Sequence, residues 1–253
     1  MSRSDSAPTL GLALSGGAIL GTAHIGALQA LDERGLRVTH LAGTSMGAII
    51  ASFYAFGFTG KEIEDVTEEL RWPDVTGFSP SKLGFLSMDR LQGTLRKHLG
   101  RVRIEEAPVK LALIAADIGS GEKVVLTEGD LATAVAASAC VPGVFIPVEW
   151  EGRLLVDGGI LENLPLSPLR AWGVDRIVAV DVLMGRRYHQ PTTILELLLN
   201  ALDMALASVS RERARDVDIL ITPDTTQWGR VEMSEVPALV REGYRAAMEA
   251  LGG

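Results

Sequence analysis

Ser45 stands in a pattern that can turn a serine hydroxyl into a nucleophile. The run Gly43-Thr44-Ser45-Met46-Gly47 fits Gly-x-Ser-x-Gly, whose small residues permit a sharp strand-to-helix turn that exposes the serine. An apolar strand predicted to end at Ala42 and a helix predicted to begin at Ser45 supply that context. The field of the helix N-terminus would favour attack by the hydroxyl on a carbonyl carbon. The alternative is a glycine-eased turn in which Ser45 only caps the helix.

A second Gly-rich turn, Ser15 to Gly21, also joins a predicted strand to a predicted helix. A dinucleotide fingerprint would need glycine in place of Ala18, and a phosphate loop would need lysine in place of Thr22. An oxyanion hole remains, in which consecutive backbone amides face developing negative charge. We predict that Gly17 and Ala18 supply these amides, in a turn that also uses Gly16 and Gly21.

Asp157 follows the apolar run Leu154-Leu155-Val156 and precedes Gly158 and Gly159. A carboxylate at the end of a strand lies where sheets of this type build their active sites. Taken together with Ser45, Asp157 becomes a candidate base. Taken alone, it is equally well explained as an Asp-Gly turn.

Histidine offers a rival base. Ser45, Asp157 and His189 follow the chain order of an α/β-hydrolase triad, but only two strands are predicted before Ser45 and His189 lies in a polar run. His24 is better explained as a packing residue. The sequence shows no metal-binding pattern, so we expect neither a metal nor a cofactor.

The pattern of elements predicts an α/β fold, with a mostly parallel sheet covered by helices on both faces. We expect a flexible N-terminus over residues 1–8 and a single domain over residues 9–253. The formal net charge of -8 argues against nucleic acid as a partner, and Cys140 is the only cysteine. Strands are expected at Leu10–Ser15, Val38–Ala42, Val109–Asp117, Lys123–Thr127, Ile146–Val156, Arg176–Val182 and Val217–Thr222.

Two segments could meet an apolar phase. Ile194–Val209 is too short and too acidic to span a bilayer, and its acidic polar stripe favours core burial or a dimer interface over membrane contact. The loop Trp72–Leu86 is the better candidate for a mobile cover over the site. The first residues imitate a secretory leader, but cleavage there would remove the Gly-rich turn. We therefore expect a cytoplasmic protein. The sequence leaves open both peripheral membrane contact and homo-oligomerisation.

The Gly-rich turn, the serine motif and Asp157-Gly158-Gly159, in this order, resemble the patatin-like phospholipase family. The likeness extends over nearly the whole chain. It includes Ala115-Ala116-Asp117 with Ser120-Gly121, Ala137-Ser138-Ala139, Val141 to Phe145, Asn163-Leu164-Pro165, Val217 to Leu220 and Gly243-Tyr244.

This resemblance implies a three-layer α/β sandwich and a serine acyl hydrolase that acts on lipids or other acyl esters. By the same resemblance Ser45 is the nucleophile and Asp157 its partner in a Ser-Asp dyad. Gly43 and Gly47 form the elbow around Ser45, and Gly158 and Gly159 support the dyad at Asp157. The turn from Gly16 through Gly21 is the oxyanion hole.

The chain departs from the family turn at two positions. Ala18 replaces a glycine, and we expect its amide to donate if its backbone angles are ordinary. Leu20 replaces a basic residue, and together with the net charge of -8 this predicts a preference for neutral esters over anionic phospholipids. These departures motivate a non-catalytic lipid-binding module as an alternative. A transacylase using the same serine is another, although malonyl-type transacylases carry histidine where this chain has Thr44.

Overall fold

The chain forms an eight-stranded, mostly parallel sheet in the order β10-β9-β1-β2-β5-β8-β7, with β6 paired to β5. The computed structural model describes residues 8–69, 76–79, 81–185, 190–194, 196–198, 200–201, 204, 214–229 and 233–252. Neighbouring strands from β10 through β5 run parallel, while β6, β7 and β8 join by antiparallel pairing. The strands are β1 Leu10–Leu14, β2 His40–Thr44, β5 Lys110–Asp117, β6 Lys123–Leu126, β7 Val148–Trp150, β8 Arg153–Asp157, β9 Arg176–Val180 and β10 Ile219–Ile221.

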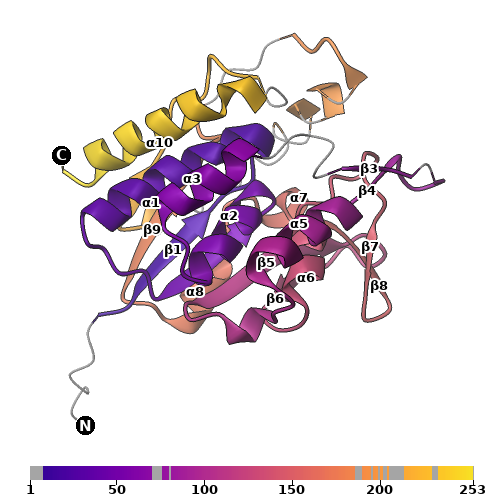
Figure 1. Ribbon diagram of the computed structural model, residues 1–253, viewed down its shortest axis with the longest axis horizontal. Helices are drawn as coiled ribbons and strands as arrows, with labels where there is room; N and C mark the ends of the chain where they lie inside the picture. The colour runs from indigo at the N-terminus through magenta and orange to yellow at the C-terminus, as the bar shows by residue number, and fades with distance from the viewer. Residues whose placement is uncertain are drawn as a thin grey trace.

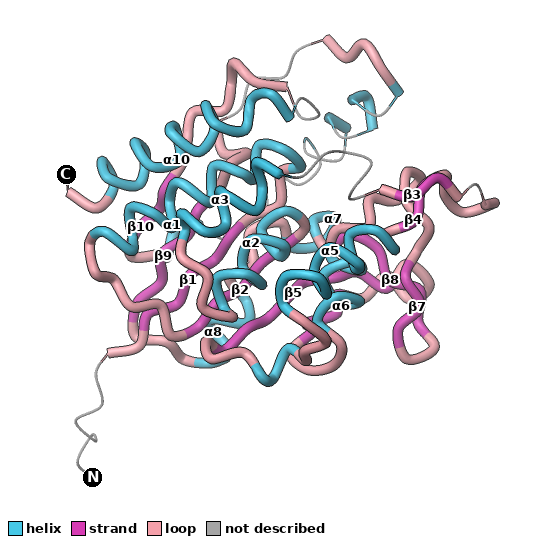
Figure 2. Tube along the Cα trace, in the orientation of Figure 1, coloured by secondary structure: helices cyan, strands magenta, loops and turns pink. Residues whose placement is uncertain are grey.

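Helices cover both faces of this sheet, as predicted. Because successive side chains of a strand point to opposite faces, Leu12 and Leu14 enter one core and Ala13 enters the other. The larger core packs beneath α1 Ala23–Glu33, α2 Met46–Ala55, α6 Leu131–Ser138 and α10 Val236–Ala250. The smaller core lies against α8 Ser167–Trp172. Figures 1 and 2 show α1, α2, α3 (Gly60–Glu69) and α10 together on one face.

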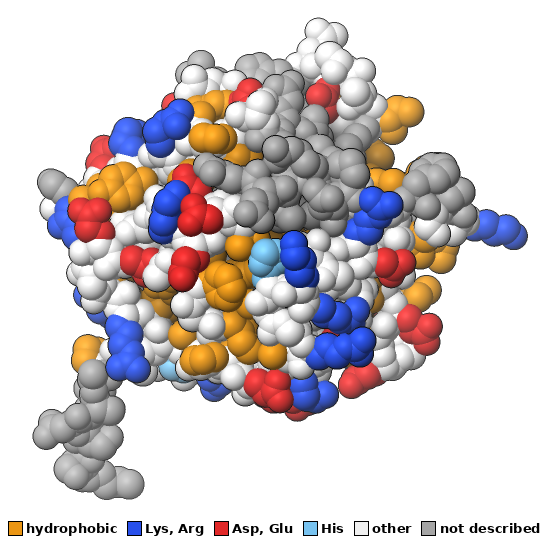
Figure 3. Space-filling view, in the orientation of Figure 1, with side chains coloured by type: hydrophobic (Ala, Val, Ile, Leu, Met, Phe, Trp, Pro, Cys, Tyr) orange, Lys and Arg blue, Asp and Glu red, His pale blue; other side chains and the backbone are white. Residues whose placement is uncertain are grey.

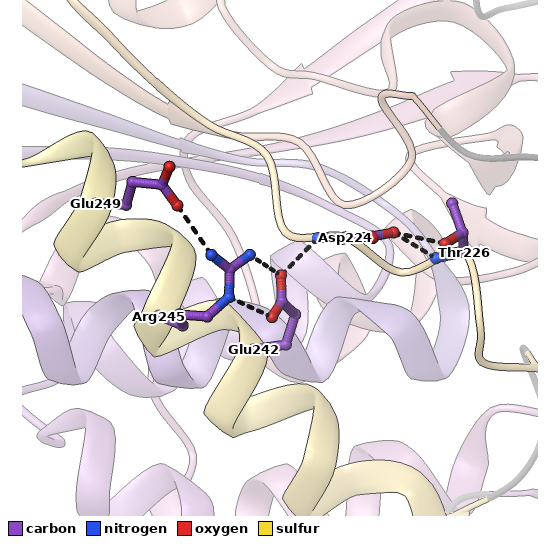
Figure 4. Close-up of polar contacts among 5 residues, drawn as sticks. All are labelled: Asp224, Thr226, Glu242, Arg245 and Glu249. Carbon is purple, nitrogen blue, oxygen red and sulfur yellow. Dashed lines mark hydrogen bonds and ion pairs between the residues drawn. The ribbon is translucent and has the colours of Figure 1, made fainter.

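Helix α10 is tied to the loop after the last strand of the sheet. Glu242 accepts a hydrogen bond from the Asp224 amide at 2.8 Å, and it also binds Arg245, which reaches on to Glu249 (Figure 4). Exposed ion pairs of this kind contribute at most about 1 kcal/mol each. Helix α10 also packs along α1, which follows the Gly-rich turn.

Two predicted segments differ from the structure, and two helices were not predicted. Ile146–Val156 is not one strand, because a turn at Glu151 and Gly152 folds it into the β7–β8 hairpin. The described part of Trp72–Leu86 contains a small hairpin, β3 Gly77–Phe78 with β4 Leu86–Ser87, rather than a loop alone. Residues 72–75 and 80 lie outside the described residues. Two helices beside the site, α5 Asp89–Leu99 and α6, did not follow from the sequence reasoning.

The segment Ile194–Val209 does not bury its described apolar side chains. Ile194 is 78% exposed, Leu197 55% and Met204 54%. Core burial, one of the two expectations for this segment, is therefore wrong for these side chains. Within the described residues, no helix is both long and apolar enough to cross a membrane.

Charged side chains of both signs are interspersed on the helical face of the molecule. Figure 3 shows Lys and Arg beside Asp and Glu across this face.

Candidate active site

Ser45 occupies a strained turn between β2 and α2. Its backbone angles are φ 54° and ψ -121°, a conformation that side chains other than glycine rarely adopt. Such strain costs on the order of 1–3 kcal/mol and is concentrated at functional sites. The predicted strand and helix are confirmed, although β2 ends at Thr44, two residues later than predicted, and α2 begins at Met46, one residue later.

The two glycines of the elbow let α2 approach the sheet closely. A Cβ atom on Gly47 would lie 2.3 Å from the carbonyl oxygen of Leu14, and one on Gly43 would lie 2.5 Å from that of Gly47. Neither distance tolerates a side chain. Ser45 makes no side-chain bond that caps its helix, which contradicts the explanation of Ser45 as only an N-cap.

Asp157 ends β8 and is only 6% exposed. Its carboxylate accepts hydrogen bonds from the Ser45 hydroxyl and, at 2.8 Å, from the Gly159 amide. Burial raises the pKa of Asp157 to about 6, and the two hydrogen bonds oppose that rise. A carboxylate with this pKa is a stronger base than an exposed aspartate and remains ionised at neutral pH.

The described histidines lie away from Ser45 and Asp157. His24 is fully buried, with Nε2 at 2.8 Å from the carbonyl oxygen of Ser15. His40 lies against Trp172 with the two rings tilted, and His98 lies against Phe53. His189 lies outside the described residues, so the triad alternative is left to experiment. Within the described part of the chain, no cluster of His, Cys, Asp or Glu is suited to a metal ion.

The Gly-rich turn lies directly beside Ser45. A Cβ atom on Gly16 would lie 3.2 Å from that of Ser45, and one on Gly21 would lie 2.5 Å from Cγ of Met46. The Gly16 amide already donates to the carbonyl oxygen of Asn163 at 3.2 Å. Gly16 and Gly21 therefore allow close approach, and Gly16 cannot serve as an oxyanion donor while that bond is made.

The donors that remain in this turn come from Gly17 and Ala18. Ala18 is the first residue of the 3₁₀ helix Ala18–Thr22, and Gly17 comes directly before it. The first amides of a helix have no acceptor within that helix. Ala18 has φ 50°, so the ordinary backbone angles on which its donation was expected to depend are not present, and its role as a donor stays a prediction. A left-handed backbone conformation costs alanine roughly 1–2 kcal/mol, a cost that glycine at this position would not have.

Leu20 does not face the site. Its side chain is fully buried within the larger core. The argument that Leu20 sets a preference for neutral substrates therefore loses its basis.

We expect Leu20→Arg to destabilise the fold by about 3–5 kcal/mol, because it buries an unpaired charge. Thermal unfolding measures this loss. Leu20→Met is the matched control, since a swap of similar volume costs less than about 1.5 kcal/mol. A stable Leu20→Arg protein with altered substrate preference would contradict this placement.

His24 should make the protein sensitive to acid. Burial lowers the pKa of His24 to about 4, whereas the unfolded chain binds this proton at its ordinary 6.5. Protonation therefore favours the unfolded state, and up to about 3 kcal/mol of stability is lost as pH falls from 6.5 to 4. His24→Gln keeps a donor for Ser15 and does not titrate. We expect urea midpoints of the two proteins to diverge in that window, and a constant difference would contradict the assignment.

Two buried polar residues to which the sequence assigned no role support the elbow. Ser138 accepts a hydrogen bond from the Ser45 amide at 3.1 Å and donates to the carbonyl oxygen of Ile114 at 2.6 Å. The carbonyl oxygen of Glu162 accepts from the Thr44 hydroxyl at 3.0 Å. A serine inside an alanine-rich helix was the available signal for Ser138, whereas no sequence signal pointed to Glu162.

Comparison with known proteins decides the family. The family model described as patatin-like phospholipase matches residues 12–170, which include both motifs and Asp157. The chain belongs to the patatin-like phospholipase family. An uncharacterised NTE family protein of Mycobacterium tuberculosis is 38% identical over 186 residues, which cover 71% of this chain and 51% of the relative. The patatin-like chain thus spans about half the length of that relative.

Other members and solved structures agree with this family assignment. Lysophospholipase NTE1 of Candida glabrata is 31% identical over 196 residues, covering 72% of this chain and 11% of that protein. VipD from Legionella pneumophila superposes with a TM-score of 0.55 at 17% identity, over 99% of this chain and 71% of VipD. ExoU of Pseudomonas aeruginosa gives 0.53 at 15% identity, over 97% of this chain and 53% of ExoU. These structures support the fold, and the predicted patatin-like sandwich is confirmed.

Proposed function

We propose that this patatin-like protein is a serine acyl hydrolase that acts on lipid or other carboxylic esters. The observation that carries the proposal is the hydrogen bond from the strained, uncapped Ser45 to the buried Asp157. The family match and the similarity to a protein named lysophospholipase support the substrate class.

The proposed reaction proceeds through an acyl-enzyme. Ser45 Oγ attacks the ester carbonyl carbon while its proton passes to Asp157. The amides of Gly17 and Ala18 stabilise the oxyanion. The carbon–oxygen bond to the alcohol then breaks, and Asp157 returns the proton to that leaving oxygen. Water repeats the sequence on the Ser45 ester, which releases the carboxylic acid and restores the serine.

Product analysis tests this reaction. A neutral short-chain ester, incubated with purified protein, should release one carboxylic acid per alcohol. Addition of glycerol separates the transacylase alternative, because acyl transfer would form a glycerol ester in place of the acid. The absence of both products, with the ester still bound, would identify a lipid-binding module instead.

A further inference from the structure

Asn163 joins the Gly-rich turn to the segment that carries Asp157. Its carbonyl oxygen accepts the Gly16 amide at 3.2 Å, and its Nδ2 donates to the Gly16 carbonyl oxygen at 3.5 Å. Both polar groups of the Gly16 backbone are thus held by one residue. Rotation or withdrawal of the turn would break both contacts together.

The carboxamide of Asn163 lies near both members of the proposed dyad. Its Oδ1 is 2.6 Å from the position that a Cβ on Gly16 would take, and that position is 3.2 Å from Cβ of Ser45. The same oxygen is 3.2 Å from the corresponding position on Gly159, which is 3.0 Å from Oδ1 of Asp157. Asn163 is half-buried.

The residue before Asn163 is anchored firmly. The Glu162 carboxylate is buried and accepts hydrogen bonds from Lys123 Nζ at 2.6 Å, Ser167 Oγ at 2.6 Å and the Ser167 amide at 2.8 Å. Its own carbonyl oxygen holds Thr44, the residue before the nucleophile. Glu162 and Asn163 therefore fix the elbow and the Gly-rich turn, respectively, to one short segment.

We propose that Asn163 is a positioning residue, which holds the Gly-rich turn so that the Gly17 and Ala18 amides face the oxyanion formed at Ser45. The inference rests on the proposed function and extends it to a residue outside the dyad and the oxyanion turn. Misplacement of catalytic groups by about 1 Å can cost a hundredfold in rate, so a clamp on this turn matters for catalysis.

Asn163→Ala tests the clamp kinetically. We expect kcat for a soluble ester and the rate of fluorophosphonate labelling to fall together by about 10–100-fold, with KM changed by less than about threefold. Asn200→Ala, at the only other asparagine of the chain, is the matched control and should keep wild-type rates. Wild-type labelling and turnover by Asn163→Ala would overturn the proposal. A wild-type protein that the probe does not label would overturn the proposed function itself.

Asn163→Asp gives a readout that a purely structural role would not move. This isosteric change adds a negative charge beside Asp157, which should raise the pKa of that carboxyl. The midpoint of the pH–rate profile should then move upward from about 6 by half a unit or more, while Asn163→Ala leaves it in place. The effect of Asp157→Asn on the free energy of unfolding should likewise begin at a higher pH in the Asn163→Asp background than in the wild type. This measurement does not depend on enzyme activity. An unmoved midpoint would contradict the position of Asn163 beside the dyad.

Discussion

Ser45→Ala is expected to lower ester turnover by several orders of magnitude, on the order of a millionfold where a catalytic serine is lost. No other hydroxyl lies in a strained elbow with a hydrogen bond to Asp157, among the residues that the structure describes. Turnover of a soluble ester measures the loss, and mass spectrometry shows whether a fluorophosphonate still attaches to the protein.

Ser52→Ala is the matched control for this substitution. Ser52 lies on the same helix, is fully buried, and donates only to the Ala48 carbonyl oxygen at 2.7 Å. It should keep both labelling and turnover. Probe attachment that survives Ser45→Ala would remove Ser45 from its proposed role.

Asp157→Asn should also damage activity severely, although less than Ser45→Ala, while it stabilises the fold. Loss of a general base costs about 10²–10⁴-fold in rate, and the amide cannot accept the Ser45 proton. The gain in stability has its origin in burial, which raises the pKa of Asp157 from its ordinary 3.8 to about 6 in the folded protein. At neutral pH the folded protein must keep a buried charge that the asparagine variant does not carry. The folded state therefore loses stability as pH rises from about 4 to 6, by up to about 3 kcal/mol.

Chemical denaturation at several pH values checks the second half of this prediction. At pH 8 the Asp157→Asn protein should be the more stable, and its advantage should shrink as pH falls through 6 toward 4. Asp117→Asn provides a contrast, because backbone amides hold the pKa of that carboxyl below its usual range. An Asp157→Asn protein that is less stable than the wild type at pH 8 would contradict a desolvated carboxylate.

The sequence predicted the parts of the site that depend on local backbone geometry. Gly43 and Gly47 are required by close contacts within the elbow, and Asp157 follows from a short apolar strand that ends at a glycine pair. The parallel sheet was predicted for a similar reason. Buried strands leave runs of apolar residues that can be recognised without knowledge of their neighbours.

The features that escaped prediction depend on contacts between distant segments. Helix α6 is apolar on all sides because it is buried on nearly all sides, so it lacks the one-sided pattern of a surface helix. The contacts of Asn163 with Gly16 join residues 147 positions apart. Leu20 is buried because the turn directs its side chain into the core. The sequence shows that leucine replaces the family's basic residue, but it does not show in which direction the side chain points.

The central claim is that Asp157 activates Ser45 without a histidine, and the most direct test is the pH dependence of fluorophosphonate labelling in His189→Gln. Because the base is the ionised carboxylate, the labelling rate should rise with pH through a midpoint near 6. The His189→Gln protein should keep the wild-type midpoint and plateau rate. A His189→Gln protein that labels as slowly as Asp157→Asn would contradict the dyad and establish a triad in its place.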